Sequence, residues 1–262
     1  MKAYIKPLMW VGNQFRKNRF GLFLDLLKDF EGTERMEEGL RILDIGGREA
    51  FWESMGFANS KHQFTILNVE DEKRPPRHDN FKTVVGDARK LTGVYRGDYD
   101  LVFSNSVIEH VGKWEDQVAM ASEIHRIADA YLVQTPNYYF PLEPHFHVPY
   151  FQMMPLEVRT KLIQRYQLGC MPKLEDAAAA RQLAEETRLV KRDEMARLFP
   201  DAELREERIL GLTKSFIALK HRSAHPVTIA PPVMPIGQET YEKQPEVAAK
   251  TGTDSERNKR VA

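Results

Sequence analysis

The chain has 262 residues, 42% hydrophobic and 29% charged, a composition that suits one globular domain with a full core. Its 38 Lys and Arg residues balance 38 Asp and Glu residues, so the charge does not indicate a nucleic-acid partner. The one cysteine, Cys170, excludes an internal disulfide framework and a zinc site built from cysteines.

Targeting signals are also absent from the sequence pattern. No run of about 18 consecutive apolar residues predicts a membrane span. The first residues lack the apolar stretch and small-residue cleavage site of a signal peptide. We therefore expect a cytoplasmic protein with no membrane span. The sequence carries no signal for an oligomeric state.

The first predicted element is a helix over residues 13–30. Its apolar residues recur at helical spacing and form one stripe, which consists of Phe20, Phe23, Leu24, Leu27 and Phe30. Basic residues precede the stripe, and a basic, aromatic helix is able to contact a membrane surface. We favour a helix that packs on a sheet or covers the mouth of a binding site.

A buried strand and a glycine turn follow the helix. Ile42, Leu43 and Ile45 form the short apolar run that is typical of a strand covered on both faces. Gly46 and Gly47 then allow a sharp turn and a close approach of bare backbone to a ligand. In an open α/β sheet, the end of such a strand is where a nucleotide-like cofactor binds. The complete dinucleotide fingerprint G-x-G-x-x-G is absent.

Strands and helices then alternate, which predicts a parallel sheet with right-handed crossovers. Further strands are expected at 64–70, 82–88, 100–105 and 131–137, with a helix at 114–128. Polar residues fall at the carboxyl ends of these strands, which is the ligand-binding edge of an open α/β sheet. Two more strands, at 202–210 and 214–220 around Gly211, are predicted to close the sheet as an antiparallel pair.

The segment 138–188 interrupts the alternation. Its first part, 138–172, is rich in aromatic residues and proline, which is typical of a lid or pocket wall rather than a spacer. Helices are expected at 155–166, 173–188 and 191–199. Beyond residue 222 the chain becomes proline-rich and polar, so we predict a domain over 1–222 and a disordered tail over 223–262.

Four motifs, in order along residues 40–220, resemble those of class I S-adenosylmethionine-dependent methyltransferases. They are Ile42-Leu43-Asp44-Ile45-Gly46-Gly47, Val85-Gly86-Asp87-Ala88, the fourth-strand motif of residues 99–111, and the closing strand of residues 211–218. The resemblance, closest to a bacterial small-molecule subgroup, implies an α/β fold. We expect an open, mostly parallel seven-stranded Rossmann-like sheet with helices on both faces and an aromatic lid insertion after strand 5.

The resemblance also implies S-adenosylmethionine as cofactor and assigns residues to it. Asp44, Gly46 and Gly47 correspond to the turn that receives the amino acid end. Asn68 or Glu70 corresponds to the residue that binds the ribose of the cofactor. Asp87, with Ala88, corresponds to the residues that bind its adenine. Asn105 lies where the fourth strand meets the methionine portion. Departures from the family pattern are Arg48 and Ala50, where further glycines are usual, and Asn68, where an acid is usual.

Methyl transfer needs alignment and desolvation, and it needs a base only when the acceptor is a poor nucleophile. The catalytic candidates are His110 and Glu109, which follow the fourth strand, and His145 in the aromatic segment. Glu143 and His147 are further candidates. The spacing of His145 and His147 is compatible with a metal site, but without cysteines or assigned carboxylate partners we predict no metal.

The expected activity is O-methylation of a small-molecule or glycan-like acceptor. A non-catalytic protein that binds the cofactor or a partner on the same fold is the alternative, and Arg48, Ala50 and Asn68 favour it. A nicotinamide-dependent oxidoreductase is disfavoured by the missing glycine fingerprint. An RNA methyltransferase is disfavoured by the neutral charge and the lack of an appended RNA-binding module.

Overall fold

The computed structural model describes residues 5–71 and 74–222, with side chains described from residue 14 onward. All of these residues belong to one unit, which spans Met1–Val227. A disordered tail is predicted over 223–262, and this segment lies outside the described residues.

The described part of the chain contains α-helices, strands and two short 3-10 helices. The helices are α1 (Ile5–Lys28), α2 (Glu34–Glu38), α3 (Glu49–Ser54), α4 (Trp114–Ile127), α5 (Leu156–Arg165), α6 (Ala177–Glu186), α7 (Arg192–Leu198), η1 (Ile108–His110) and η2 (Phe151–Met153). The strands are β1 (Arg41–Ile45), β2 (Gln63–Asn68), β3 (Phe81–Val85), β4 (Leu101–Asn105), β5 (Ala130–Pro136), β6 (Glu203–Ile209) and β7 (Leu212–Lys220).

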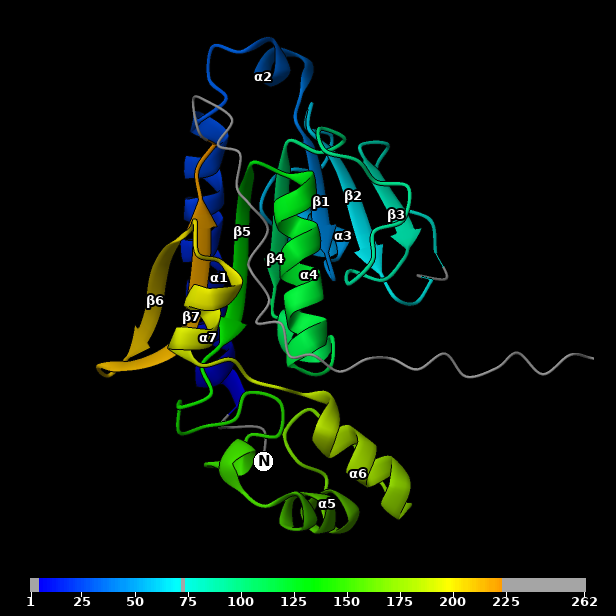
Figure 1. The fold of residues 1–262 in the computed structure, drawn as a ribbon, viewed down its shortest axis with the longest axis vertical. Coiled ribbons are helices and arrows are strands. Elements are labelled where there is room, and N and C mark those ends of the chain that lie inside the picture. Colours follow the sequence, from blue (N-terminus) through cyan, green and yellow to red (C-terminus); the bar gives the residue numbers. More distant parts are fainter. Residues whose placement is uncertain (1–4, 72–73, 223–262) are drawn as a thin grey trace, which may run out of the picture. The chain divides into compact units, whose positions relative to one another are not determined.

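The seven strands form one open sheet in the order β3-β2-β1-β4-β5-β7-β6 (Figure 1). The five strands from β3 to β5 are parallel, and β7 pairs antiparallel with both β5 and β6. This arrangement confirms the predicted Rossmann-like, mostly parallel sheet and its antiparallel closing pair. Because strand order reverses between β1 and β4, the carboxyl ends of these two strands form the crevice in which open α/β sheets bind ligands.

Helices cover both faces of the sheet, as predicted. On one face, α4 and α7 pack on the sheet around Ile124, Met195 and Val133. On the other face, α1 and α3 pack around Phe23, Trp52 and Phe103. Such double coverage explains why β1 and β5 read as nearly continuous apolar runs, since both faces of these strands are buried.

Several element boundaries differ from the sequence-based prediction, and those of the first helix and the second strand bear on the site. The first helix begins at Ile5 rather than at residue 13, because Pro7 falls in its first turn, where proline removes no intrahelical hydrogen bond. The second strand ends at Asn68 rather than at Glu70. Its parallel pairing with β3 stops at the Asn68–Val85 pair, because β3 ends there and the chain continues into Gly86.

The segment 138–188 has a small core of its own. Phe146 and Phe151 stack with ring centroids 4.1 Å apart, and α5 and α6 pack on them through Ile163 and Ala180. A turn at Gly169 fixes the loop before this core, because Cys170 N–H donates to the His145 carbonyl over 3.0 Å. The segment is therefore a packed subdomain after β5, in the position predicted for a lid.

Arg19 of α1 is buried and ties the helix to the carboxyl edge of the sheet. Its Nε and Nη2 donate to the two carboxylate oxygens of Glu207 on β6, over 2.7 and 2.9 Å. Its Nη1 donates to Gln134 Oε1 over 2.9 Å and also to Asn105 Oδ1. One guanidinium thus joins β4, β5 and β6 to α1, and the Ser215 hydroxyl donates to the same Glu207 carboxylate.

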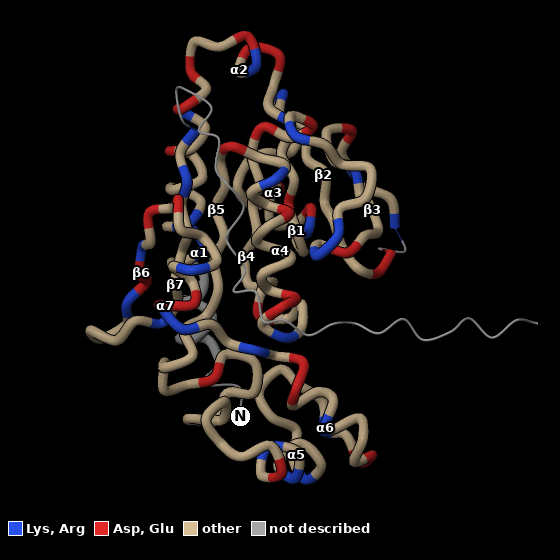
Figure 2. Tube along the Cα trace, in the orientation of Figure 1, with Lys and Arg blue, Asp and Glu red and all other residues tan. Residues whose placement is uncertain are grey.

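The edge strand β6 carries acidic and basic residues side by side, as Figure 2 shows. Arg205 pairs with Glu203 and Arg208 with Glu206, each two residues away on the same strand. Charged side chains on an edge strand discourage pairing with another chain. The acidic and basic residues of each pair neutralise each other, so β6 presents no uniform patch of one sign.

The buried pair of Arg19 and Glu207 leads to a stability prediction. Arg19→Ala leaves a buried carboxylate without its cation, so we expect it to lower the free energy of unfolding by about 3–5 kcal/mol. Urea denaturation measures the change. Lys28→Ala, which breaks an exposed pair with Asp25 on the same helix, is the matched control and should leave the midpoint nearly unchanged. Equal midpoints for the two variants would contradict the prediction.

Candidate functional site

The turn after β1 requires glycine at two successive positions. Gly46 has a φ of +71°, and a Cβ there would overlap the Val107 side chain. A Cβ on Gly47 would overlap the carboxylate of Asp44. The chain therefore brings bare backbone against a buried acid at the carboxyl end of β1.

Asp44 is buried, and its two carboxylate oxygens have different surroundings. Oδ2 accepts a hydrogen bond of 2.7 Å from the indole N–H of Trp52 on α3. Oδ1 is buried and has no hydrogen-bond partner among the described residues. Burial raises the pKa of Asp44 to about 7, although the Trp52 hydrogen bond opposes the shift. A buried acceptor without a partner at a ligand-binding edge calls for a donor from outside the chain.

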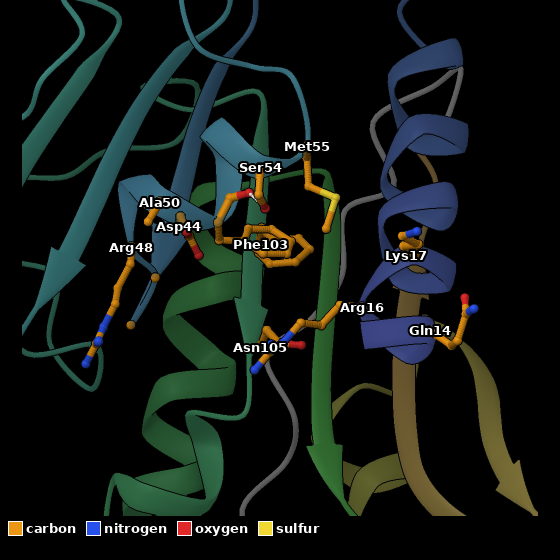
Figure 3. Close-up of a pocket in the computed structure, with 13 residues that line it drawn as sticks. Gln14, Arg16, Lys17, Asp44, Arg48, Ala50, Ser54, Met55, Phe103 and Asn105 are labelled. Carbon is orange, nitrogen blue, oxygen red and sulfur yellow. Dashed lines mark hydrogen bonds between the residues drawn. The ribbon is translucent and has the colours of Figure 1, made fainter. Parts of the chain in front are cut away.

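Two pockets meet at this turn, and Gly46 lines both. The larger one, of about 780 Å³, is bounded by β1, β4, α3 and α1. In Figure 3, Met55 and Phe103 lie between α3 and α1, and Arg16 extends from α1 toward Asn105. The smaller pocket, of about 320 Å³, lies over the ends of β2 and β3.

The structure brings most of the predicted cofactor residues to these two pockets. Those that line the larger pocket are Asp44, Gly46, Gly47 and Asn105, and those that line the smaller one are Gly46, Asn68, Asp87 and Ala88. Arg48 and Ala50, which stand at the positions of the family's further glycines, line the larger pocket. Glu70 lies two residues beyond β2, is exposed and lines neither pocket.

Several of these side chains already have partners within the chain. The Asn68 amide donates to the Gly47 carbonyl over 3.2 Å, which links β2 to the glycine turn. Arg89 donates to both carboxylate oxygens of Asp87, over 2.7–3.0 Å, and lowers the pKa of that carboxyl. Asn105 accepts from Arg19. Asp87 and Asn105 therefore enter the site as members of hydrogen-bonded pairs.

The predicted catalytic residues come together in one group, which we call the His–Glu cluster: Glu109, His110, Glu143 and His145. The Nε2 atoms of His110 and His145 face each other at 3.0 Å. The Nδ1 atom of His145 lies 2.7 Å from Glu143 Oε1. Ligand atoms of Glu109, His110 and His145 all lie within 4.8 Å of one another. His147, which is exposed, is not part of this group.

Backbone contacts hold the cluster in place. Glu143 is buried, and its Oε2 accepts from the backbone N–H groups of His145 and Phe146 over 2.7 and 2.6 Å. Glu109 is completely buried in η1, and its Oε2 accepts from the Thr135 hydroxyl of β5 over 2.9 Å. Glu109 Oε1 has no partner among the described residues.

The pKa shifts in the cluster follow from burial and from neighbouring charges. Burial raises the pKa of Glu109 to about 7. Although part of His110 is exposed, the protein around its ring and the charge of His145 lower its pKa to about 4. Burial lowers the pKa of His145, but the hydrogen bond and charge of Glu143 outweigh burial and raise it overall. Neutral imidazole is thus favoured at His110.

Sequence reasoning missed the residues that support the site from a distance in the chain. It did not assign Trp52 to Asp44, Arg19 to Asn105, or Thr135 to Glu109. A signal for one of them was present, since Arg19 falls on the same helical face as Phe23. A charged residue on a buried face requires a partner. Nothing in the linear sequence paired His110 with His145, which are 35 residues apart.

Comparisons with known proteins found a partial match to one family model and a short segment shared with curated proteins. Residues 42–130 match the family model described as a methyltransferase domain. A 53-residue segment is 40% identical to an uncharacterized protein of Mycobacterium tuberculosis strain H37Rv, and equally to one of strain CDC 1551 / Oshkosh. That segment spans 20% of this chain and 18% of either relative, so the alignment covers only a small part of both.

Solved structures show distant likeness. Magnesium protoporphyrin IX methyltransferase from Synechocystis PCC 6803 with bound SAH has a TM-score of 0.45 at 13% identity, over 79% of this chain and 83% of that one. The N-terminal domain of EvdMO1 with SAH bound also has a TM-score of 0.45, at 16% identity, over 75% and 77% of the two chains. Within residues 5–71 and 74–222, no helix combines the length and apolar character needed to cross a bilayer.

The raised pKa of Asp44 predicts a pH-dependent stability. In the unfolded chain the carboxyl ionises near pH 4, whereas in the folded chain it keeps its proton to about pH 7. The folded state binds more protons in this window, so the free energy of unfolding falls as the pH rises through it. Asp44→Asn removes this dependence. Between pH 5 and pH 8, the variant should gain about 2–3 kcal/mol relative to the unchanged protein.

Urea denaturation at the two pH values measures this gain. The other buried carboxyl group with a raised pKa, Glu109, titrates in both proteins and cancels in the comparison. Parallel pH dependences of the two proteins would show that Asp44 ionises normally in the folded state.

Proposed function

We propose that this chain is a class I S-adenosylmethionine-dependent methyltransferase, a proposal supported by the match of residues 42–130 to the methyltransferase-domain model, and that it methylates an oxygen of a small-molecule or glycan-like acceptor. The observation that carries the proposal is the buried, unpartnered oxygen of Asp44 beside the Gly46–Gly47 turn, where two pockets meet. The acceptor class is inferred from the polar lining of the larger pocket and from the His–Glu cluster.

The residues around the turn fit the amino acid end of the cofactor. An ammonium group supplies the donor that Asp44 Oδ1 lacks. The absence of a side chain at Gly47 keeps the Asp44 carboxylate accessible from the turn. When bound, the sulfonium cofactor supplies a methyl group that is already activated for displacement. Asp44 and the two glycines are thus the groups that would position the donor.

The smaller pocket fits a nucleoside. Asn68 lies at the end of β2 for the ribose, and Asp87 with the backbone of Ala88 lies at the end of β3 for the adenine. Leu67 and Val107 provide apolar walls for a ring. Because Arg89 neutralises Asp87, this acid would serve as a hydrogen-bond acceptor rather than as an isolated charge.

The larger pocket fits a polar acceptor. Gln14, Arg16 and Lys17 of α1 line it opposite Phe103, so donors and cations face an aromatic wall. This combination suits hydroxyl-bearing molecules, whose apolar ring faces pack on aromatic side chains while their oxygens accept hydrogen bonds. In this proposal, Arg16 and Lys17, in the middle of α1, contribute to the acceptor pocket.

Oxygen methylation needs a group that removes or acidifies the hydroxyl proton, because an alcohol is a weak nucleophile at neutral pH. The His–Glu cluster offers that group. Glu143 holds the Nδ1 side of His145, so the Nε2 atoms of both histidines are directed at each other. His110 lines the smaller pocket, which supports a cluster that acts from the donor side of the site on an acceptor that enters from the larger pocket.

Cofactor binding tests the donor site directly. By calorimetric titration, the full chain should bind S-adenosylhomocysteine with micromolar affinity and should not bind a nicotinamide dinucleotide. Gly47→Ala should weaken this binding at least 100-fold, because the new Cβ overlaps the Asp44 carboxylate. Gly21→Ala, at a helix position where the new Cβ would meet no described atom within 4 Å beyond its chain neighbours and the backbone of its own helix, should bind like the unchanged protein. Unchanged affinity in Gly47→Ala would refute the assignment.

Methyl transfer tests the cluster. With radiolabelled cofactor and a panel of hydroxylated acceptors, His110→Ala should lower kcat by about 10²–10⁴-fold, the usual contribution of a positioned acid–base group. Its affinity for S-adenosylhomocysteine should stay within a few-fold. The His147→Asn variant, altered at an exposed histidine outside the cluster, should keep full activity. Tight cofactor binding with no transfer to any acceptor would favour the non-catalytic alternative.

A further inference from the structure

The geometry points to a site for one divalent cation of the zinc type, formed by Glu109, His110 and His145. This inference rests on the proposed function, because it states how the cluster would activate the acceptor hydroxyl. The sequence-based prediction was that no metal binds, and it considered only His145 with His147. The structure instead pairs His145 with His110, beside a buried carboxylate.

The distance between the two imidazoles is close to that of two zinc ligands. Two nitrogens that each lie about 2.0–2.1 Å from a tetrahedral zinc ion are about 3.3 Å apart. The Nε2 atoms of His110 and His145 lie 3.0 Å apart and face each other. A small outward movement of either ring is enough to admit a cation between them. Imidazole pairs of this kind suit zinc and its neighbours among the transition metals.

The carboxylate of Glu109 has one oxygen without a partner among the described residues. Glu109 is fully buried, and its Oε1 has no hydrogen-bond partner in the described part of the chain. Its other oxygen is fixed by Thr135, so the free oxygen cannot turn to solvent without breaking that bond. A buried, unpartnered carboxylate oxygen costs free energy unless a ligand satisfies it. A cation beside the two histidines would satisfy it.

His145 is held in position by a carboxylate on the far side of its ring. A zinc-binding histidine usually donates its second ring N–H to a carboxylate or carbonyl, which fixes the tautomer. Glu143 takes this position at 2.7 Å from His145 Nδ1. Glu143 is itself held by two backbone N–H groups, so it forms a rigid outer shell. Because Glu143 holds Nδ1, Nε2 is the ring nitrogen of His145 that lies toward His110.

A second group with possible metal ligands lacks these features. Glu49, Glu53 and His78 also bring their ligand atoms within 4.8 Å of one another. Both oxygens of Glu49, however, accept from the backbone N–H of Arg77, and one also accepts from that of His78. That group serves to fix a loop, and its carboxylate is already satisfied.

Three protein ligands leave a tetrahedral cation one open position, which is typical of catalytic rather than structural sites. An acceptor hydroxyl in that position would lose its proton to water at neutral pH, because the cation lowers the pKa of the oxygen it contacts. The oxygen electron pair then forms the bond to the methyl carbon. The bond between that carbon and sulfur breaks, and its electron pair leaves with the sulfur as a neutral thioether.

The test measures zinc binding rather than activity. The full chain, freed of any affinity tag and treated with a chelator, is titrated with Zn²⁺ by calorimetry, and bound metal is counted after desalting. We expect one Zn²⁺ per chain, and no binding of Mg²⁺, which prefers oxygen ligands. Cys170→Ser controls for the exposed thiol and should bind zinc like the unchanged protein.

Variants locate the site. Glu109→Gln, His110→Ala and His145→Ala should each weaken zinc binding at least 100-fold. The His147→Asn variant is the matched control in the same loop, since asparagine tolerates the left-handed backbone of this position (φ +54°), and it should bind normally. Binding of S-adenosylhomocysteine, measured in chelator, shows that each variant is folded.

The outcomes separate this inference from the proposed function. If S-adenosylhomocysteine binds but zinc does not, or if zinc binds equally well to all cluster variants, the cation site is refuted and the methyltransferase proposal stands. If zinc binds at the cluster but S-adenosylhomocysteine does not bind, the proposed function fails and the cation site stands.

Discussion

Arg19 determines how α1 sits on the sheet, and much of the site depends on that position. Its guanidinium reaches Glu207, Gln134 and Asn105, which lie on three different strands. Glu207 and Gln134 are buried and Asn105 is partly buried, so the guanidinium satisfies polar groups that have little access to solvent. The helix that carries Arg19 also supplies Gln14, Arg16 and Lys17 to the larger pocket. The wall of that pocket is therefore positioned by this buried ion pair together with the apolar face of α1 around Phe23.

Two buried acids give the site its chemical character. Asp44 and Glu109 each use one carboxylate oxygen for a neighbouring side chain and leave the other without a partner among the described residues. They lie at the ends of adjacent strands, one directly in β1 and the other in the short helix after β4. Two buried carboxylates with unsatisfied oxygens at the carboxyl ends of β1 and β4 lower the stability of the fold. Such destabilising groups are typical of sites that bind ligands.

The strands were readily predicted from sequence because β-branched and apolar runs report burial on both faces, as in Ile42–Ile45. The glycine turn was predicted because a turn of this kind tolerates few other residues. The site was only partly predictable. The alternation of strands and helices along the chain predicts a parallel sheet, and the order of its strands brings Asp87 and Ala88 to their pocket. Pairing of His110 with His145 depends instead on how the segment 138–188 folds back, and no periodicity in the chain records such a contact.

The segment 138–188 packs around its own core of Phe146, Phe151 and Ile163, yet contributes only His145 and Glu143 to the cluster. The donor half of the site, from β1 to β3, owes nothing to that core. Glu109 and His110 lie outside this segment, in η1, so the cluster is closed only when the segment packs against the main sheet. A change within the segment's own core would therefore shift His145 away from His110 while the turn at Gly46 and Gly47 remained as it is.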